Sequence, residues 1–151
     1  SAPRPFAAPA PDRSRRTVLI SFSTTYQRQE KAIARSVEAV AGLDVDGVLT
    51  LGPAMRHHAP PRAANVTVFD YAPHDALIPS CAAVVCHGGH GTLLRPLSQG
   101  VPVLCLTMGR DHPDNAARLV ARGAGLRLGR NASAGAIRRS LRRLLEEPSF
   151  A

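Results

Sequence analysis

Short apolar runs alternate with segments of helical periodicity along most of the chain. The apolar runs have the length of buried strands, and there are six of them: residues 17–22, 45–51, 65–69, 82–86, 101–106 and 126–128. The helical segments between and after them cover residues 27–41, 92–99, 113–122 and 134–145. Strand and helix therefore alternate about six times, which predicts an α/β fold with a doubly wound, Rossmann-like parallel sheet of about six strands.

Two of the helical segments also indicate which of their faces turns toward the core. In residues 27–41 one face collects four apolar side chains, Ile33, Val37, Val40 and Ala41, and Gly42 ends the helix. In residues 134–145 the buried face is expected to hold Ile137, Leu141, Leu144 and Leu145. Four arginines are then expected on the solvent side of this last helix: Arg138, Arg139, Arg142 and Arg143.

Polar residues cluster directly after several of the predicted strands. The clusters comprise residues 23–25, 71–74, 87–92 and 107–112. Parallel strands end at the same edge of a sheet, and open α/β sheets bind ligands at the carboxyl ends of their strands. These clusters are therefore expected to line one ligand cleft.

The glycine-rich stretch His87-Gly88-Gly89-His90-Gly91-Thr92 carries the clearest chemistry. Glycines between a strand and a helix let bare backbone N–H groups approach an anion, and the histidines and the threonine can donate to phosphate oxygens. This predicts a diphosphate cradle. Two other interpretations remain open: a metal site that uses His87 and His90, and a structural strand-to-helix turn. Neither the phosphate-loop motif of ATPases nor the three-glycine dinucleotide fingerprint is present.

The charge of the chain narrows the choice of partner. The formal net charge is +8 over 151 residues, which by itself suggests nucleic acid. However, residues 1–16 hold four arginines against one aspartate and residues 130–147 hold five arginines against two glutamates, so the excess lies near the ends. Aromatic residues make up 4% and tryptophan is absent, which leaves little surface for stacking bases. We therefore expect no nucleic-acid partner.

Composition also predicts the organisation of the chain and its compartment. Residues 1–16 are rich in proline and alanine and are expected to be an extended linker, followed by one domain over residues 17–151. The three cysteines, Cys81, Cys86 and Cys105, lie in or beside apolar runs and are expected to be buried free thiols of a cytoplasmic protein. No apolar run has the length of a membrane span. Because the chain begins with serine, we expect it to be part of something longer.

Five segments, in order and at matching spacing, resemble one known family. They read SFSTT, DYAPHDALIPSC, HGGHGT, GVPVLCL and RDHPDNAARLVARGAG. The chain resembles the C-terminal, donor-binding domain of GT-B glycosyltransferases, in the bacterial natural-product (macrolide-type) branch of the UDP-glycosyltransferase superfamily. The resemblance covers about Thr17 to Leu145 and implies the C-terminal half of a GT-B architecture.

The resemblance implies a role for each matching residue. It places Ser23, Thr24 and Thr25 at the distal phosphate, Tyr71 and Ala72 against a uracil or thymine ring, and Asp111 and His112 at hydroxyls of the transferred sugar. It implies that the diphosphate is bound by His87 and by the loop of Gly88, Gly89, His90, Gly91 and Thr92. The family usually has glutamine where His112 stands, so this sequence leaves the identity of the sugar open.

The implied activity is an inverting sugar transfer from a UDP-sugar or a TDP-sugar to a hydroxyl of a small natural product. His87 would stabilise the leaving diphosphate without a metal or another cofactor, and the catalytic base belongs to the N-terminal acceptor domain, which this sequence does not contain. The isolated chain is thus expected to bind the donor and to be inactive. The alternative is a non-catalytic nucleotide-binding or partner-binding subunit of the same fold. An epimerase would need further acidic residues in the cleft.

Overall fold

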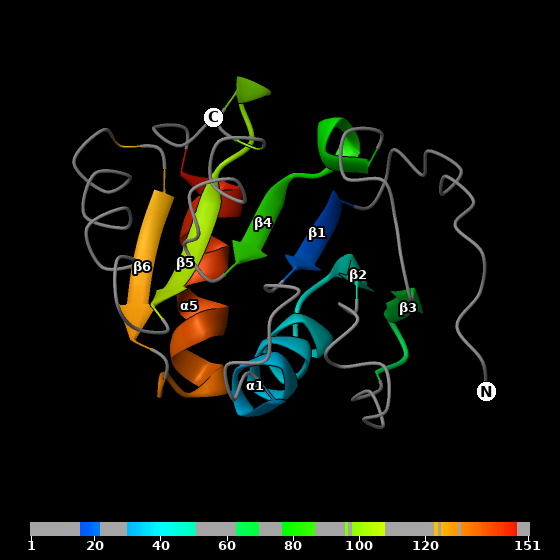
Figure 1. Cartoon of the computed structure of the whole chain (residues 1–151), viewed down its shortest axis with the longest axis vertical. Coiled ribbons are helices and arrows are strands. Elements are labelled where there is room, and N and C mark those ends of the chain that lie inside the picture. Colours follow the sequence, from blue (N-terminus) through cyan, green and yellow to red (C-terminus); the bar gives the residue numbers. More distant parts are fainter. Residues whose placement is uncertain are drawn as a thin grey trace.

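The computed structural model shows one six-stranded sheet in which every pair of neighbouring strands is parallel. It describes residues 16–21, 30–50, 63–69, 77–86, 96, 98–107, 123, 125–129 and 131–147. The strands are β1 (Arg16–Ser21), β2 (Val45–Thr50), β3 (Val66–Phe69), β4 (Ala83–Cys86), β5 (Val103–Thr107) and β6 (Gly125–Gly129). Their order across the sheet is β3-β2-β1-β4-β5-β6 (Figure 1). The predicted α/β fold with about six parallel strands is confirmed.

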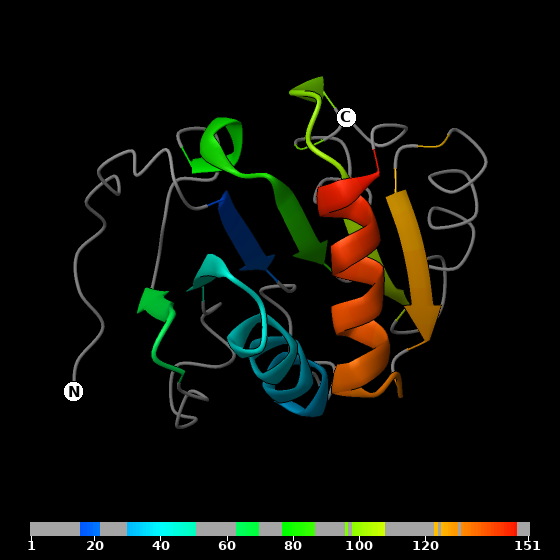
Figure 2. The same ribbon diagram turned by 180° about the vertical axis from the view of Figure 1, so that it is seen from behind.

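Two long helices form a layer on one face of this sheet. They are α1 (Glu30–Ala41) and α5 (Ala134–Glu146), and Figure 2 shows them side by side in front of the strands. A short 3-10 helix, η2 (Ile78–Ser80), precedes β4. Of the predicted helix 92–99, residues 96 and 98 are helical, whereas the predicted helix 113–122 lies outside the described residues. The predicted stop at Gly100 fits its positive φ of 72°, a conformation that glycine adopts without strain.

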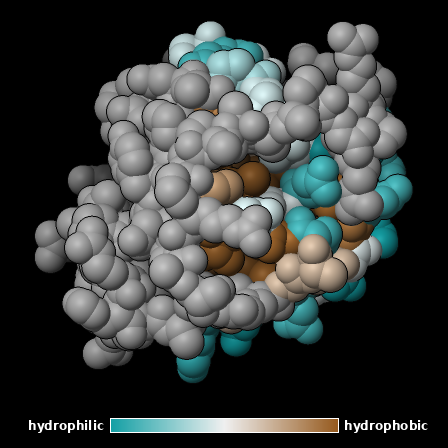
Figure 3. Space-filling view, turned by 90° about the vertical axis from the view of Figure 1, so that its right-hand side faces the viewer, coloured by the Kyte–Doolittle hydropathy of each residue, from teal (hydrophilic) through white to brown (hydrophobic). Residues whose placement is uncertain are grey.

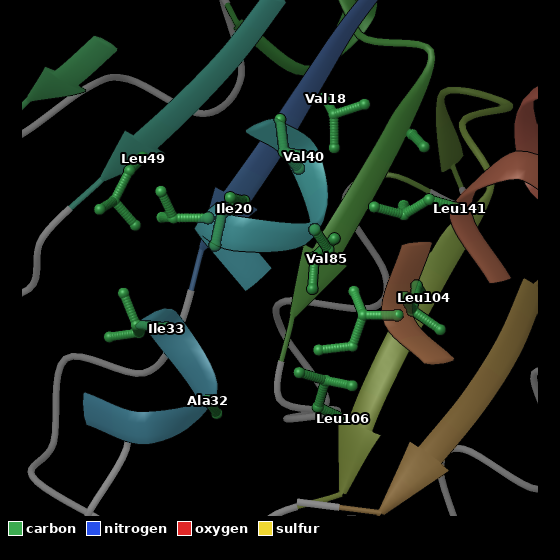
Figure 4. Packing of buried hydrophobic residues seen from close by; sticks show 14 of the residues in the cluster. Val18, Ile20, Ala32, Ile33, Val40, Leu49, Val85, Leu104, Leu106 and Leu141 are labelled. Atoms are coloured by element: carbon green, nitrogen blue, oxygen red, sulfur yellow. The ribbon is translucent and has the colours of Figure 1, made fainter. Parts of the chain in front are cut away.

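The helix layer and the sheet enclose the larger of two apolar clusters. Alternate residues of the central strands, among them Ile20, Val85 and Leu104, point toward α1 and α5 (Figure 4). Ile33 of α1 and Leu141 of α5 meet them there, and all of these side chains are buried. Apolar residues therefore recur every two positions in the strands and about every 3.6 positions in the helices, and these apolar faces pack against each other in one core.

The opposite face of the sheet carries the second apolar cluster. It contains the other alternate strand residues together with side chains that flank β4 and β5: Leu19, Val48, Phe69, Leu77, Ile78, Cys81, Val84, Cys86, Val101, Val103 and Cys105. Burial on both faces explains why the strands read as continuous apolar runs. Seen from the side on which β3 lies, hydrophobic surface is visible in the middle of the molecule, with hydrophilic residues beside it (Figure 3).

The buried face of α1 differs from the prediction at its last residue. Ile33, Val37 and Val40 are buried as expected, but Ala41 is exposed. Three other residues of the helix are buried instead, namely Ala32, Ser36 and Ala39. The reason is that α1 packs against α5 as well as against the sheet, which turns its buried stripe away from Ala41. The buried Ser36 hydroxyl donates to the Ala32 carbonyl at 2.7 Å, so it is satisfied within the helix.

The last helix also differs from the prediction, at Arg138 and Leu145. Leu145 is only partly buried at the edge of the core. Arg138 was expected to face solvent, but its guanidinium donates to the Ala39 carbonyl at 3.2 Å and to the Glu38 carbonyl at 3.1 Å. A Cβ at Gly42 would lie 2.5 Å from this guanidinium, so glycine permits the approach. Arg138 therefore binds carbonyls in the last turn of α1, where a positive charge is also favoured.

We expect Arg138→Ala to lower the free energy of unfolding by about 1–2 kcal/mol, because it removes two charge-assisted hydrogen bonds between α5 and α1. Urea denaturation measures this loss. Arg139→Ala is the matched control, since Arg139 is adjacent and exposed, and it should change the free energy by less than about 0.5 kcal/mol. Equal effects of the two substitutions would show that the bridge adds nothing to stability.

Candidate functional site

The carboxyl ends of the strands form one edge of the sheet. Because all strand pairs are parallel, β1, β2, β3, β4 and β5 end on the same side, with Ser21, Thr50, Phe69, Cys86 and Thr107 as their last residues. The predicted polar clusters continue the chain from β1, β3, β4 and β5. The fold therefore brings the starting points of those clusters to one edge, as the alternation of strand and helix predicts.

Every residue predicted to bind a ligand lies outside the described residues. These are Ser23, Thr24, Thr25, Tyr71, Ala72, His87, Gly88, Gly89, His90, Gly91, Thr92, Asp111 and His112. Their distances from the described strands can still be counted along the chain. His87 directly follows the last residue of β4, Ser23 and Tyr71 come two positions after β1 and β3, and Asp111 comes four positions after β5. Their contacts remain predictions.

The strand order singles out one point on this edge. From β1 the chain passes through α1 to β2 on one side, whereas β4 and β5 follow on the other side of β1. The order thus reverses between β1 and β4, and in open α/β sheets such a switch point is where ligands bind. The two strands that flank it lead directly into the predicted phosphate contacts, residues 23–25 and residues 87–92. This is the strongest geometric support for the predicted cleft.

Two buried hydroxyl groups at this edge were not anticipated from the sequence. Ser21 and Thr50 are in-register partners at the ends of β1 and β2, and they are only 4% and 9% exposed. Both take part in polar interactions. Neither hydroxyl stood out in the sequence, because Ser21 and Thr50 lie inside the predicted runs 17–22 and 45–51 and are each followed by an apolar residue.

The three cysteines are buried and free, as predicted. Burial raises the pKa of Cys81 to about 12 and is also the main reason why the pKa of Cys105 rises to about 12. Neighbouring Cys86 adds to the rise at Cys105, and Arg127 opposes it. The thiols of Cys81 and Cys105 are therefore protonated at neutral pH, and neither is an activated nucleophile.

Among the described residues, no three side chains of His, Cys, Asp or Glu are grouped so that they could hold a metal ion. The two histidines considered as metal ligands, His87 and His90, lie outside the described residues. None of the described helices combines the length and the apolar composition that a membrane crossing requires.

Residues 34–151 match the profile of a family described as "Erythromycin biosynthesis protein CIII-like, C-terminal domain". The chain belongs to this family. Among the similar curated proteins, aklavinone 7-beta-L-rhodosaminyltransferase of Streptomyces galilaeus is 42% identical over 118 residues, which are 76% of this chain and 26% of that protein. Aclacinomycin-T 2-deoxy-L-fucose transferase of the same organism is 39% identical over 147 residues, 93% of this chain and 33% of that protein.

Solved structures agree with this membership of the CIII-like family. The spinosyn forosaminyltransferase SpnP matches with a TM-score of 0.78 and 31% identity, covering 99% of this chain and 41% of that one. The glycosyltransferase VinC, solved in complex with DTDP, matches with a TM-score of 0.73 and 34% identity, covering 95% of this chain and 38% of that one. The fold is that of the C-terminal half of GT-B glycosyltransferases. The chain spans less than half the length of each of these relatives.

Proposed function

We propose that this chain is the donor-binding domain of an inverting glycosyltransferase, which moves a sugar from a UDP-sugar or TDP-sugar to a hydroxyl of a small natural product. The observation that carries the proposal is the switch point between β1 and β4, whose carboxyl ends lead directly into residues 23–25 and 87–92. The names of relatives support the donor class. One is a "TDP-daunosamine transferase", 42% identical over 115 residues, and VinC was solved with DTDP.

Each of the predicted residues has a role in this proposal. His87, at the end of β4, donates to the diphosphate, and the amides of Gly88, Gly89, His90 and Gly91 with the Thr92 hydroxyl complete its cradle. The hydroxyls of Ser23, Thr24 and Thr25, beyond β1, contact the distal phosphate. Tyr71 and Ala72 hold the base, and Asp111 and His112 bind hydroxyls of the sugar.

The chemistry divides between this chain and an acceptor domain that precedes it in the parent enzyme. The acceptor oxygen attacks the anomeric carbon, the bond from that carbon to the diphosphate breaks, and a base on the acceptor domain takes the hydroxyl proton. The diphosphate leaves with negative charge, which hydrogen-bond donors such as His87 stabilise without a metal. This chain alone should therefore bind the donor and transfer nothing.

The direct test is calorimetric titration of the 151-residue chain with UDP, TDP, ADP and inorganic diphosphate at fixed salt. A preference for UDP or TDP over ADP would establish the donor site and would show whether the site prefers uracil or thymine. Binding that is equal for all four ligands and fades with salt would reflect net charge alone and would overturn the proposal. A chain that also transfers sugar by itself would refute the assignment of the base to another domain.

We expect His87→Ala to weaken binding of the preferred nucleoside diphosphate by about 1–3 kcal/mol, roughly 5- to 150-fold in Kd, because it removes a hydrogen bond to a charged group. The same titration measures this change. His57→Ala is the matched control, since we assign no role to His57, and its Kd should stay within about twofold of the unsubstituted chain. If both variants lose affinity equally, or neither does, the role of His87 is wrong.

A further inference from the structure

Ser21, the last residue of β1, lies at the switch point between β1 and β4 (Figure 1). The strands pair in parallel with Ile20 opposite Val85, and one further step along both strands places Ser21 beside Cys86. Residues 87–92, which carry the predicted diphosphate cradle, begin directly after Cys86. Ser21 therefore lies where the two strands at the switch point lead into their predicted phosphate contacts.

The Ser21 side chain is polar but is buried among apolar neighbours. It continues the alternation of Leu19 along β1, so it faces the apolar cluster opposite α1 and α5. Its in-register partner Thr50 brings a second buried hydroxyl to the same face. A buried hydroxyl costs free energy unless it makes a hydrogen bond, and neither of these two is among the described buried side-chain atoms without a partner. A strand end that only filled the core would avoid this cost with an apolar residue.

The position of Ser21 suits a hydroxyl that holds the chain leaving β1. Serine hydroxyls commonly bond to backbone groups close by in sequence, such as the N–H two residues further on. Two residues after Ser21 is Ser23, the first of the three residues to which the proposed function gives the distal phosphate. Being only 4% exposed, Ser21 offers little surface to a ligand, so an action through the backbone of the neighbouring residues is favoured over direct contact.

We propose that Ser21 is a positioning residue for the distal phosphate of the donor. Its hydroxyl holds the chain that leaves β1, so that residues 23–25 are oriented for the phosphate before the donor arrives. A contact that is oriented in advance loses less conformational freedom on binding and therefore contributes more affinity. This inference rests on the proposed function. Thr50 has no such role, because β2 leads into residues to which the proposed function gives no part.

The test compares ligands that differ only in the distal phosphate: UDP with UMP, and TDP with TMP. Calorimetric titration gives the ratio of the Kd of the monophosphate to that of the diphosphate. Ser21→Ala should lower this ratio by about 5- to 10-fold, because the diphosphate loses a well-oriented contact while the Kd of the monophosphate stays within about twofold. A general loss of structure would weaken both ligands alike. Ser21→Thr keeps the hydroxyl and should keep the ratio.

Thr50→Val is the matched control for Ser21→Ala. It removes an equally buried hydroxyl from the in-register position one strand further from the switch point, with little change in shape. Its ratio should stay within about twofold of that of the unsubstituted chain. Circular dichroism shows whether each variant is folded. Ser21→Cys has nearly the same volume as serine and a thiol that donates weakly, so it should show the same selective loss as Ser21→Ala.

Three results would overturn the inference while the proposed function stands, that is, while the unsubstituted chain prefers UDP or TDP over ADP. The first is an unchanged ratio in folded Ser21→Ala, and the second is an equal loss in Thr50→Val. The third is failure of both Ser21→Ala and Ser21→Cys to fold, which would mean that the hydroxyl serves the core alone. Equal binding of UDP, TDP and ADP by the unsubstituted chain would instead overturn the proposed function, and this inference with it.

Discussion

Replacing Leu104 by alanine is expected to lower the free energy of unfolding by about 2–5 kcal/mol, the largest loss that we predict for a single truncation. Leu104 is the second residue of β5 and is 0% exposed. Figure 4 shows its side chain among those of Val85, Leu106 and Leu141, where the sheet meets α5. Alanine would leave a cavity between these two layers, because neither the strands nor the helix can collapse freely into it.

Urea denaturation of Leu104→Ala beside two comparison variants measures this effect. Leu126 is the in-register neighbour of Leu104 on β6 and points to the same face, but it is only partly buried, so Leu126→Ala should cost clearly less, about 1–2 kcal/mol. Leu104→Met keeps the volume of the side chain and should cost less than about 1.5 kcal/mol. If the two alanine variants lose the same stability, β5 is not the centre of the core.

The strands and their direction were predictable because their signal is local. Each apolar run has the length of a buried strand, and the helical segments predicted between several of the successive runs favour parallel pairing. The order β3-β2-β1-β4-β5-β6 was not predicted, since it depends on the side to which each crossover turns. The two apolar clusters also follow from the alternation of residues along each strand.

The mispredicted features of the helices arise from contacts between residues far apart in sequence. Arg138 meets carbonyls about a hundred positions earlier, and Arg16 donates to the carbonyl of Leu145 near the other end of the chain. Both arginines bind carbonyls in the last turn of a helix from a distant part of the chain, so no pattern within either helix reveals them. A local signal was overlooked at Ser133, whose side chain caps α5 by accepting from the Ala136 N–H at 3.1 Å.

The candidate site was predictable only as far as the sheet determines it. The sequence predicts that residues 23–25 and 87–92 follow strands at one edge of the sheet, whereas only the strand order of the structure shows that these two strands are neighbours at the switch point. The contacts of His87 and Tyr71 depend on the backbone conformation of their loops and on the position of the ligand. A pattern of residues in the sequence predicts neither of these. Their roles therefore remain predictions, to be tested by titration.

Asn65 joins three elements through a single side-chain amide. Its substitution is expected to cause the second large loss of stability. Its Nδ2 donates to the Val40 carbonyl at the end of α1 and to the Val45 carbonyl at the start of β2, both at 2.9 Å, with a longer contact of 3.4 Å to Leu43. Its own backbone carbonyl accepts from the Gly47 N–H at 2.7 Å. The side chain thus satisfies carbonyls of the α1–β2 turn from the start of β3.

Asn65→Asp should lower the free energy of unfolding by about 2–4 kcal/mol at pH 7. It keeps the shape of the side chain but removes both amide hydrogens, and the new carboxylate faces carbonyl oxygens in a partly buried place. Only the protonated carboxyl can donate there, so its pKa in the folded chain must rise above the unfolded value of about 3.9. A raised folded pKa means that the folded state binds more protons than the unfolded state. The penalty is therefore full above the folded pKa and shrinks as the pH falls below it.

Urea denaturation at pH 7 and at about pH 4.5, each compared with the unsubstituted chain at the same pH, separates this mechanism from a simple lost contact. Asn65→Ala loses the hydrogen bonds without adding a charge, so its cost of about 1–3 kcal/mol should not change with pH. Asn131→Asp adds the same charge at an exposed position and should stay within about 0.5 kcal/mol of the unsubstituted chain. A cost for Asn65→Asp that equals that of Asn65→Ala at both pH values would mean that the carboxylate turns to solvent. In that case the side-chain amide of Asn65 would stabilise the α1–β2 turn only through its hydrogen bonds, and the new charge would add no penalty.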